Sequence, residues 1–192
     1  MSTSIEVLYH LAEPRAGYFT TAQAGDVGVS RQQLSYLART GSIERVAHGI
    51  YRLVRFPAQR FEDVIVACLW ADDDAAASHD TALAVYELTD AMPTRIHVTV
   101  PRPFRGQRRG VVVHVAPLDP SERTSRASVP VTTVERTIAD VAQQSGTAAA
   151  VEAATQAIER GLGTRRRLRD ALGDRDDDAK AVLDAVEDAV SA

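Results

Sequence analysis

Three capping-box spacings within the first 33 residues constrain the fold of this chain more than any other sequence feature. In a capping box, a hydroxyl side chain accepts a hydrogen bond from the backbone three residues later, and a Glu or Gln at that position bonds back. The pairs are Thr3 with Glu6, Thr20 with Gln23, and Ser30 with Gln33. They predict three helices, of which the second is short and ends near Gly25 and the third runs to Gly41.

Two short apolar segments after the third helix predict a tight hairpin. They cover 42–47 and 50–54, and His48-Gly49 lies between them, where the glycine supplies the positive φ that a tight turn needs. Helix, short helix, helix and hairpin is the element order of a winged helix-turn-helix, which binds DNA. The same order also fits a small α+β module with another function.

Charge is distributed unevenly along the chain. The net charge is −4, but residues 1–57 hold six arginines against four acids, so this segment carries +2 and the remainder carries −6. A DNA-binding protein needs positive charge only on the face that meets phosphate. Arginine is favoured throughout, with Lys180 as the single lysine, so the arginine count alone is weak evidence for DNA binding.

The composition changes after Pro57, which predicts a winged helix-turn-helix domain over 1–57 and a second domain over 58–192. The expected fold class is α+β, an N-terminal winged helix-turn-helix followed by a mixed α/β C-terminal domain with a β-hairpin and a helical tail. Cys68 lies in an apolar helical pattern and is expected in the core. The N-terminus lacks the pattern of a signal peptide, and we expect a cytoplasmic protein without membrane contact.

Helix starts in the second domain are also expected from its sequence. Ser78 is an expected N-cap, and Thr132 with Glu135 has the spacing of a fourth capping box. Further helices are expected over 148–160, from Thr164 to Leu172, and over the last eighteen residues.

Two alternating segments, 96–100 and 111–115, predict the β-hairpin of the second domain. The expected antiparallel register places Ile96 opposite Val115, Val98 opposite Val113, Val100 opposite Val111, and His97 opposite His114. The loop 101–110 between the segments is basic and contains an aromatic residue, Phe104, that we expect to be exposed.

The third helix supplies the face that we expect to contact DNA. Leu34, Leu37 and Ala38 lie on one side of it and are expected to face the core, so its other side is polar. In the major groove, Gln can pair with adenine, and Arg can pair with guanine or phosphate. The candidate DNA-binding residues on this helix, the second helix and the hairpin are Thr20, Arg31, Gln32, Ser35, Tyr36, Arg39, Arg45, His48 and Arg52.

The sequence patterns do not predict catalytic residues, a cofactor or a metal site. Ser78-His79-Asp80 has the composition of a catalytic triad, but adjacent side chains diverge in space. His97 and His114 face each other in the expected hairpin without an apparent third ligand, and the acids of 72–74 are expected in a solvated loop. A nuclease site pairs carboxylates with a lysine, and Lys180 lies in the final acidic helix.

Several segments, taken in order and spacing, carry a family resemblance. They are Gly17–Ala24, Val29–Leu37, Gly41–Val46, Gly49–Leu53, Ser78–Leu83, Ile96–Pro101 and Pro130–Asp140. Together they resemble the AbiEi family of antitoxins from type IV toxin–antitoxin systems. The resemblance implies a winged helix that binds operator DNA and represses its own operon, and a C-terminal domain that counters a nucleotidyltransferase-like toxin without a stable complex. The alternative is an ordinary winged-helix transcription regulator whose C-terminal domain binds a ligand or dimerises.

Two arginine-rich segments of the second domain are expected to form the antitoxin surface. They contribute Arg105, Arg108 and Arg109 from the basic loop and Arg165, Arg166 and Arg167 from a helix start. Cations at a helix start gain nothing from the helix dipole, so stability does not explain the second group. The expected partner is polyanionic, namely RNA, DNA or an acidic protein face, and the alternative is arginine that is merely solvated.

Overall fold

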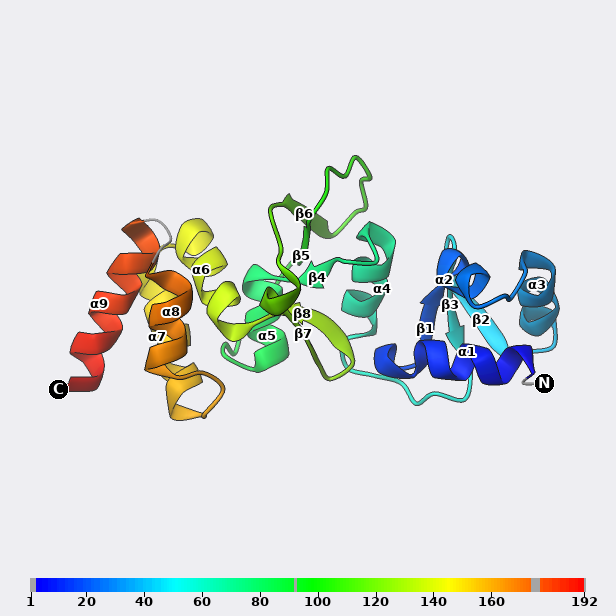
Figure 1. Cartoon of the computed structure of the whole chain (residues 1–192), viewed down its shortest axis with the longest axis horizontal. Coiled ribbons are helices and arrows are strands. Elements are labelled where there is room, and N and C mark those ends of the chain that lie inside the picture. Colours follow the sequence, from blue (N-terminus) through cyan, green and yellow to red (C-terminus); the bar gives the residue numbers. More distant parts are fainter. Residues whose placement is uncertain (1–2, 92, 174–176, 192) are drawn as a thin grey trace.

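The computed structural model describes residues 3–91, 93–173 and 177–191. The chain is elongated, with an N-terminal module at one end, a mixed sheet with its helices in the middle, and a helical tail at the other end (Figure 1). The expected α+β class is confirmed. Within the described ranges, no helix is both long and apolar enough to cross a membrane.

The N-terminal module has the element order of a winged helix-turn-helix, as predicted. Its elements are α1 (Ser4–Ala12), η1 (Glu13–Arg15), β1 (Tyr18–Thr20), α2 (Thr21–Asp26), α3 (Arg31–Arg39), β2 (Ile43–Ala47) and β3 (Ile50–Leu53). All three predicted capping boxes are formed. Strand β1 was not predicted, since three residues are too few to show a period, and it pairs antiparallel with β3 in the sheet order β1-β3-β2.

One glycine is required where the chain enters this small sheet. Gly17 has a φ of 92°, and a Cβ at this position would lie 2.7 Å from the ring of Phe56. Any side chain would therefore combine an unfavourable backbone conformation with a clash. Beside it, the core of the module contains the fully buried Phe19, Leu34 and Leu53.

The middle of the chain forms a five-stranded mixed sheet, ordered β6-β5-β4-β8-β7. Its elements are α4 (Glu62–Ala71), β4 (Ala76–Ala77), α5 (His79–Tyr86), β5 (Ile96–Val100), β6 (Val111–Val115), η2 (Pro120–Glu122), β7 (Arg123–Arg126) and β8 (Val129–Thr132). Two helices of this region, α4 and α5, contact the strands of the sheet. The β5/β6 and β4/β8 pairs are parallel, and the β4/β5 and β7/β8 pairs are antiparallel.

The predicted hairpin of 96–100 with 111–115 is wrong in direction. Both strands form, but they pair in parallel, with Ile96 opposite Val111 and Val100 opposite Val115. Apolar alternation has the same period whichever way a strand runs, so both arrangements match apolar side chains. A ten-residue connection can reach about 30 Å, whereas a five-residue strand is about 17 Å long. The loop 101–110 is therefore long enough to return the chain to the other end of β5.

The hairpin of the second domain is instead formed by β7 and β8. Its turn residues Ala127 and Ser128 both have positive φ, at 49° and 63°. This conformation resembles the two-residue type I′ turn, which is dominated by Asn and Gly. Sequence analysis missed the hairpin because neither turn residue is one that this geometry normally selects.

Two predicted N-caps in the second domain need correction. The cap of α6 (Val134–Ser145) is Thr133, whose hydroxyl accepts from the backbone of Arg136, whereas Thr132 ends β8. Ser78 does precede α5, but its hydroxyl accepts a hydrogen bond from Thr99 at 2.8 Å instead of capping the helix. In both cases the residue that local spacing assigned to a helix cap belongs to the sheet or hydrogen-bonds to it.

The tail consists of α6, α7 (Thr147–Glu159), α8 (Arg165–Leu172) and α9 (Asp177–Ser191), so the helices expected there are confirmed over the described residues. The expected start of the last helix at 175–176 lies outside those residues. Cys68 of α4 is buried as predicted, and burial raises the pKa of its thiol to about 12.

The N-terminal module and the sheet region share buried contacts. Tyr18 and Ile50 belong to the same buried cluster as Phe61 and Ile65 of the α4 region. Burial, followed by the nearby Glu62, raises the pKa of Tyr18 to about 12. The two parts therefore pack against each other across residue 57, and the division 1–57 and 58–192 stays a prediction.

Candidate nucleic-acid interface

One side of α3 is polar and exposed, and the opposite side is buried. Leu34 is 1% exposed, while Leu37 and Ala38 are half-buried. The exposed residues follow the helical repeat along the other side and are Arg31, Gln32, Ser35, Tyr36 and Arg39. The orientation predicted for the third helix is therefore confirmed, and its exposed face contains no carboxylate.

The C-terminal half of this face carries a paired aromatic and cation. Tyr36 is 57% exposed, which is unusual for a large ring. The guanidinium carbon of Arg39 lies 5.7 Å from the centroid of the Tyr36 ring, within the range of a cation–π contact. This contact orders Arg39 along the helix while its hydrogen-bond donors stay available to a ligand.

The turn of the wing presents a second pair of basic side chains. The guanidinium of Arg45 lies 3.0 Å from Nδ1 of His48 and also donates to the carbonyl of Ala47 at 3.3 Å. The backbone N–H of Thr21 donates to the carbonyl of Gly49 at 2.8 Å, which fixes the wing turn to the start of α2. Arg45 and His48 are thus exposed on a turn that the module itself holds in place.

A cavity of about 660 Å³ brings three candidate residues together from the end of β1, from α3 and from the wing. Thr20, Arg31 and His48 line it together with Trp70 of α4. The hydroxyl of Thr20 accepts from the backbone of Gln23 at 3.1 Å, so it is already used in the cap. Thr20 therefore borders the cavity chiefly as a structural residue.

Arg52 lies apart from the other candidates. Its side chain is 18% exposed, and its Nε donates to Glu44 at 2.6 Å. A second nitrogen lies 3.7 Å from Glu62, and the hydrogen bond with Glu44 is the main reason that its pKa is raised. Arg52 thus joins the wing to the start of α4. The structure places Glu44 opposite Arg52 through a register shift between Arg45 and Ala47, which the predicted two-residue turn did not include.

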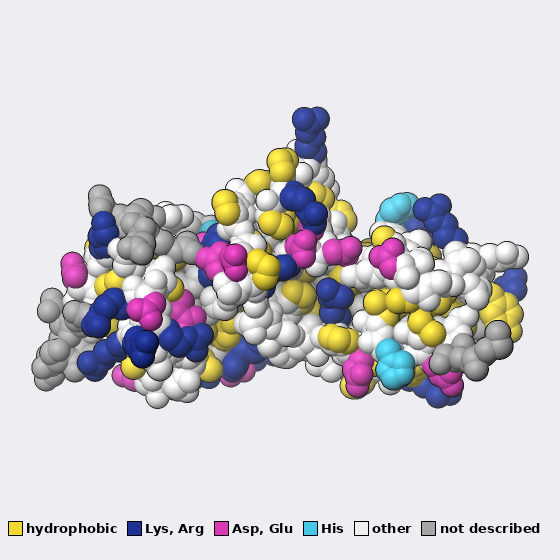
Figure 2. All heavy atoms as spheres, in the orientation of Figure 1, with side chains coloured by type: hydrophobic (Ala, Val, Ile, Leu, Met, Phe, Trp, Pro, Cys, Tyr) yellow, Lys and Arg dark blue, Asp and Glu magenta, His cyan; other side chains and the backbone are white. Residues whose placement is uncertain are grey.

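The basic loop 101–110 projects from the sheet, and Figure 2 shows Lys or Arg side chains at the tip of the projection above β5 and β6. Arg105 and Arg109 are exposed, and Arg108 is half-buried. Phe104, expected to be exposed, instead packs edge-on against Trp70 with ring centroids 5.0 Å apart. The loop is therefore anchored on α4, next to the cavity that Trp70 borders.

The expected solvated loop 72–74 also has structural contacts. Arg102 donates to Asp72 at 2.7 Å and to Asp74 at 3.0 Å, so these acids hold the base of the basic loop. Asp73 accepts a hydrogen bond from Gln23 of α2 at 2.9 Å. The acidic triplet thus connects three parts of the chain.

The arginines of α8 do not form one surface with the basic loop, since the two segments lie at different positions along the molecule (Figure 1). Arg165 and Arg166 are exposed. Arg167 is bound to the buried Glu135, with Nε 3.0 Å from Oε1. Stability therefore explains Arg167, contrary to the sequence-based expectation for this group.

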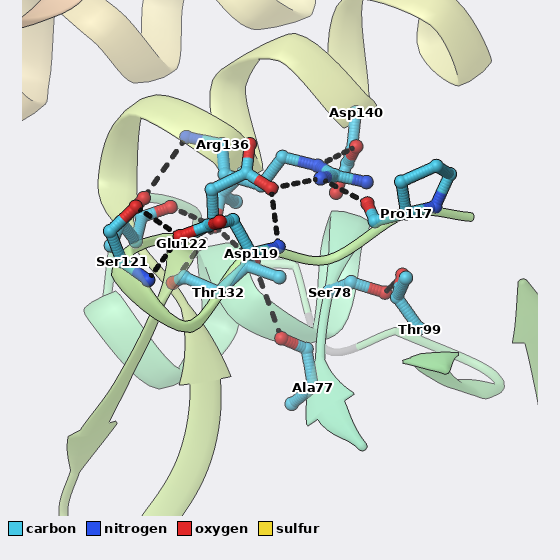
Figure 3. A network of polar contacts seen from close by, with 12 residues as sticks. Ala77, Ser78, Thr99, Pro117, Asp119, Ser121, Glu122, Thr132, Arg136 and Asp140 are labelled. Atoms are coloured by element: carbon cyan, nitrogen blue, oxygen red, sulfur yellow. Dashed lines mark hydrogen bonds and ion pairs between the residues drawn. The ribbon is translucent and has the colours of Figure 1, made fainter. Parts of the chain in front are cut away.

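Two polar clusters in the sheet region were missed in the sequence. In the first, Arg136 is enclosed by Asp140, Glu122 and the carbonyl of Pro117 (Figure 3). In the second, His79 joins His97 and His114, so a third histidine does stand beside the expected pair. The Arg136–Asp140 pair has the i, i+4 spacing of one helix and could be found from the sequence, whereas the other contacts of both clusters join separate elements.

The match to a known protein family coincides with the winged helix-turn-helix. Residues 6–54 match the family model described as a transcriptional regulator, AbiEi antitoxin. This segment is an AbiEi-type regulator domain. The AbiEi-type domain includes α3 and the wing with its candidate residues.

A solved structure is similar to nearly the whole chain, including the part that follows the AbiEi-type domain. The crystal structure of the RV2827C protein from Mycobacterium tuberculosis covers 97% of this chain and 78% of its own, at a TM-score of 0.53 and 16% identity. At this identity the similarity establishes a shared fold. No curated protein matches the chain.

Proposed function

We propose that this protein is the antitoxin and autorepressor of a type IV toxin–antitoxin system, in which residues 1–57 bind operator DNA and residues 58–192 counter a nucleotidyltransferase-like toxin. The observation that carries the proposal is the AbiEi-type regulator domain at residues 6–54. Its description as a transcriptional regulator implies binding to double-stranded DNA. The protein is proposed to act in the cytoplasm, without a cofactor and without catalysis.

The proposed DNA contacts divide between base recognition and phosphate binding. Gln32, Ser35, Tyr36 and Arg39 would enter the major groove on the exposed face of α3, and Arg31 would lie at its N-terminal turn. Arg45 and His48 of the wing would contact phosphate or the minor groove. Arg52 is left out, because Glu44 and Glu62 already bind it.

The test is whether the full chain recognises the DNA upstream of its own gene. We expect a gel-shift titration to give a specific complex, at least about 1000-fold tighter than a scrambled duplex of equal length, and a reporter behind that promoter to be repressed. Co-expression should also rescue growth from a toxin encoded beside it. Binding to both duplexes with equal affinity would contradict the autorepressor. Repression without rescue would instead favour an ordinary winged-helix regulator.

The antitoxin activity is proposed to depend on the exposed arginines of the second domain. We expect the triple variant Arg105→Ala, Arg108→Ala, Arg109→Ala to lose growth rescue while it still represses the reporter, because these residues lie on the loop above the sheet. The double variant Arg165→Ala, Arg166→Ala tests α8 separately. It leaves Arg167 in place, because that residue compensates the buried Glu135.

Growth curves in cells that co-express the toxin provide the measurement, with circular dichroism to show that each variant is folded. If the triple and the double variants both rescue as well as the parent, the arginine segments are not the functional surface.

A further inference from the structure

Three histidines from three separate elements meet at the edge of the five-stranded sheet. His79 is the first residue of α5, His97 lies in β5 and His114 lies in β6. Each offers a ring nitrogen, and these nitrogens all lie within 4.8 Å of one another. Two of the ring nitrogens, Nδ1 of His97 and Nε2 of His114, are 3.0 Å apart. The chain contains five histidines, so three of them gather at one place.

We propose that His79, His97 and His114 bind one divalent transition-metal ion of the Zn²⁺ type, with an exchangeable fourth position open to the adjoining cavity. Neutral imidazole is a favoured ligand for Zn²⁺, and three protein ligands with one open position is a common arrangement. The inference concerns the sheet region alone and does not depend on the proposed DNA binding.

The ring nitrogens need only a small rearrangement to reach one ion. Two nitrogens bound tetrahedrally at about 2.0–2.1 Å from Zn²⁺ would be about 3.3 Å apart, close to the 3.0 Å between His97 and His114. His79 and His114 are stacked, with centroids 3.8 Å and planes 17° apart. Since lone pairs lie in the ring planes, one of these two rings must rotate about χ2 to face the ion. The χ2 minimum of histidine is broad, which allows this rotation.

The protonation states and outer contacts of the rings favour metal binding. Burial, followed by the nearby His114 and His97, lowers the pKa of His79 to about 3, and burial also lowers the pKa of the other two rings. The lowered pKa values favour the neutral rings, which retain a lone pair for an ion. The hydroxyl oxygen of Ser78 lies 2.9 Å from Nδ1 of His79 and can accept a hydrogen bond from a protonated Nδ1. In that tautomer Nε2 carries the lone pair for the ion.

The side chain of Gln144 acts on the pKa of His97, so it lies close enough to orient that ring in a similar way. Ser78 is in turn held by the hydroxyl of Thr99, which donates to it at 2.8 Å (Figure 3). Partners of this kind fix the orientation of ligand rings in metal sites.

The fourth position would face a cavity of about 490 Å³ that His79 and His114 line together with Asp140 and Gln143. This volume admits water or a small anion. The nearby carboxylates of Asp140 and Glu122 are each 2.8 Å from the guanidinium of Arg136, so one oxygen of each is engaged in the ion-pair network. A bound ion would connect β6, the edge strand, to β5 and to the start of α5.

The test uses the full chain after dialysis against a chelator. Titration with ZnCl₂ in a calorimeter should show one ion per chain, and CoCl₂ should give the visible absorption of a tetrahedral nitrogen-ligated site. We expect His114→Gln, which removes a direct ligand, to weaken Zn²⁺ binding by at least about 100-fold, the upper range for loss of an outer partner, and to abolish the cobalt absorption. The exposed His10→Gln is the matched control and should bind as the parent does. The melting temperature should rise with Zn²⁺ for the parent and not for His114→Gln.

His114 is only half-buried, so its variant is expected to fold, which far-ultraviolet circular dichroism will verify. The proposal is overturned if the parent binds less than one Zn²⁺ ion per chain at about 100 micromolar ZnCl₂. Such a low affinity would be that of a weak surface site. Equal loss of binding in His10→Gln and His114→Gln would also overturn it, since the ion would then lie elsewhere.

Discussion

Replacing Arg136 with alanine is expected to destabilise the chain by about 3–5 kcal/mol. The side chain of Arg136 is 7% exposed, and its nitrogens donate to Asp140 at 2.8 Å, Glu122 at 2.8 Å and the carbonyl of Pro117 at 2.9 Å. The side chain of Asp140 is itself 6% exposed. Removal of the guanidinium would leave that carboxylate buried without its opposite charge, and such a loss is costlier than the loss of packing alone.

Urea denaturation followed by circular dichroism measures this effect as a lower midpoint. Arg60→Ala is the matched control, because Arg60 pairs with Glu87 at 3.2 Å while its side chain is 60% exposed. An exposed pair contributes at most about 1 kcal/mol. If the urea midpoint of Arg136→Ala is lowered no more than that of Arg60→Ala, the network around Arg136 does not stabilise the fold.

Arg31→Ala and Arg39→Ala are each expected to weaken specific DNA binding by about 1–3 kcal/mol. Both residues are exposed on α3, and a guanidinium that forms two hydrogen bonds to guanine contributes affinity for one base pair. Each variant should therefore lose discrimination at that base pair together with its affinity for the operator. Gel-shift titration of the full chain against single-base-pair variants of the operator measures both quantities.

The wing supplies the contrast for this experiment. Arg45→Ala should lower affinity similarly on every duplex and reduce the slope of log affinity against log salt by about one. Arg60→Ala, which lies outside the proposed interface, should change neither quantity. Unchanged affinity in both α3 variants would contradict the assignment of α3 as the recognition helix.

Local signals in the sequence predicted the N-terminal module well. A capping box needs only residues three apart, and all three predicted boxes in this module formed. The two-stranded wing followed from one glycine between two apolar segments. The strand β1 was missed there, because three residues do not display a period.

The sheet region could not be predicted to the same depth, because its arrangement depends on tertiary contacts. Alternation located 96–100 and 111–115 as strands but is unchanged when a strand is reversed, so their direction was wrong. The two-residue strand β4 carries no pattern at all. Its position between β5 and β8 is nevertheless what brings α5, and with it His79, to the pair of histidines.

The candidate DNA-binding residues show the same limit. Exposure on α3 followed from the helical repeat, and the structure places those residues as expected. Arg52 carries the same charge as Arg45, yet its position opposite Glu44 and near Glu62 removes it from the surface. Residue type alone therefore did not distinguish an arginine that joins two parts of the fold from one available to a ligand.

The buried contact of Tyr18 and Ile50 with the α4 region restricts how two copies could share one operator. A DNA-binding module on a flexible tether can rotate to meet half-sites at any separation. Here the module and the rest of the chain pack together, so the orientation of α3 in the groove also sets the direction in which the tail leaves the duplex. Inserting half a helical turn, about five base pairs, between two adjacent sites would then move the tails to opposite sides of the DNA, whereas a full turn would restore their alignment.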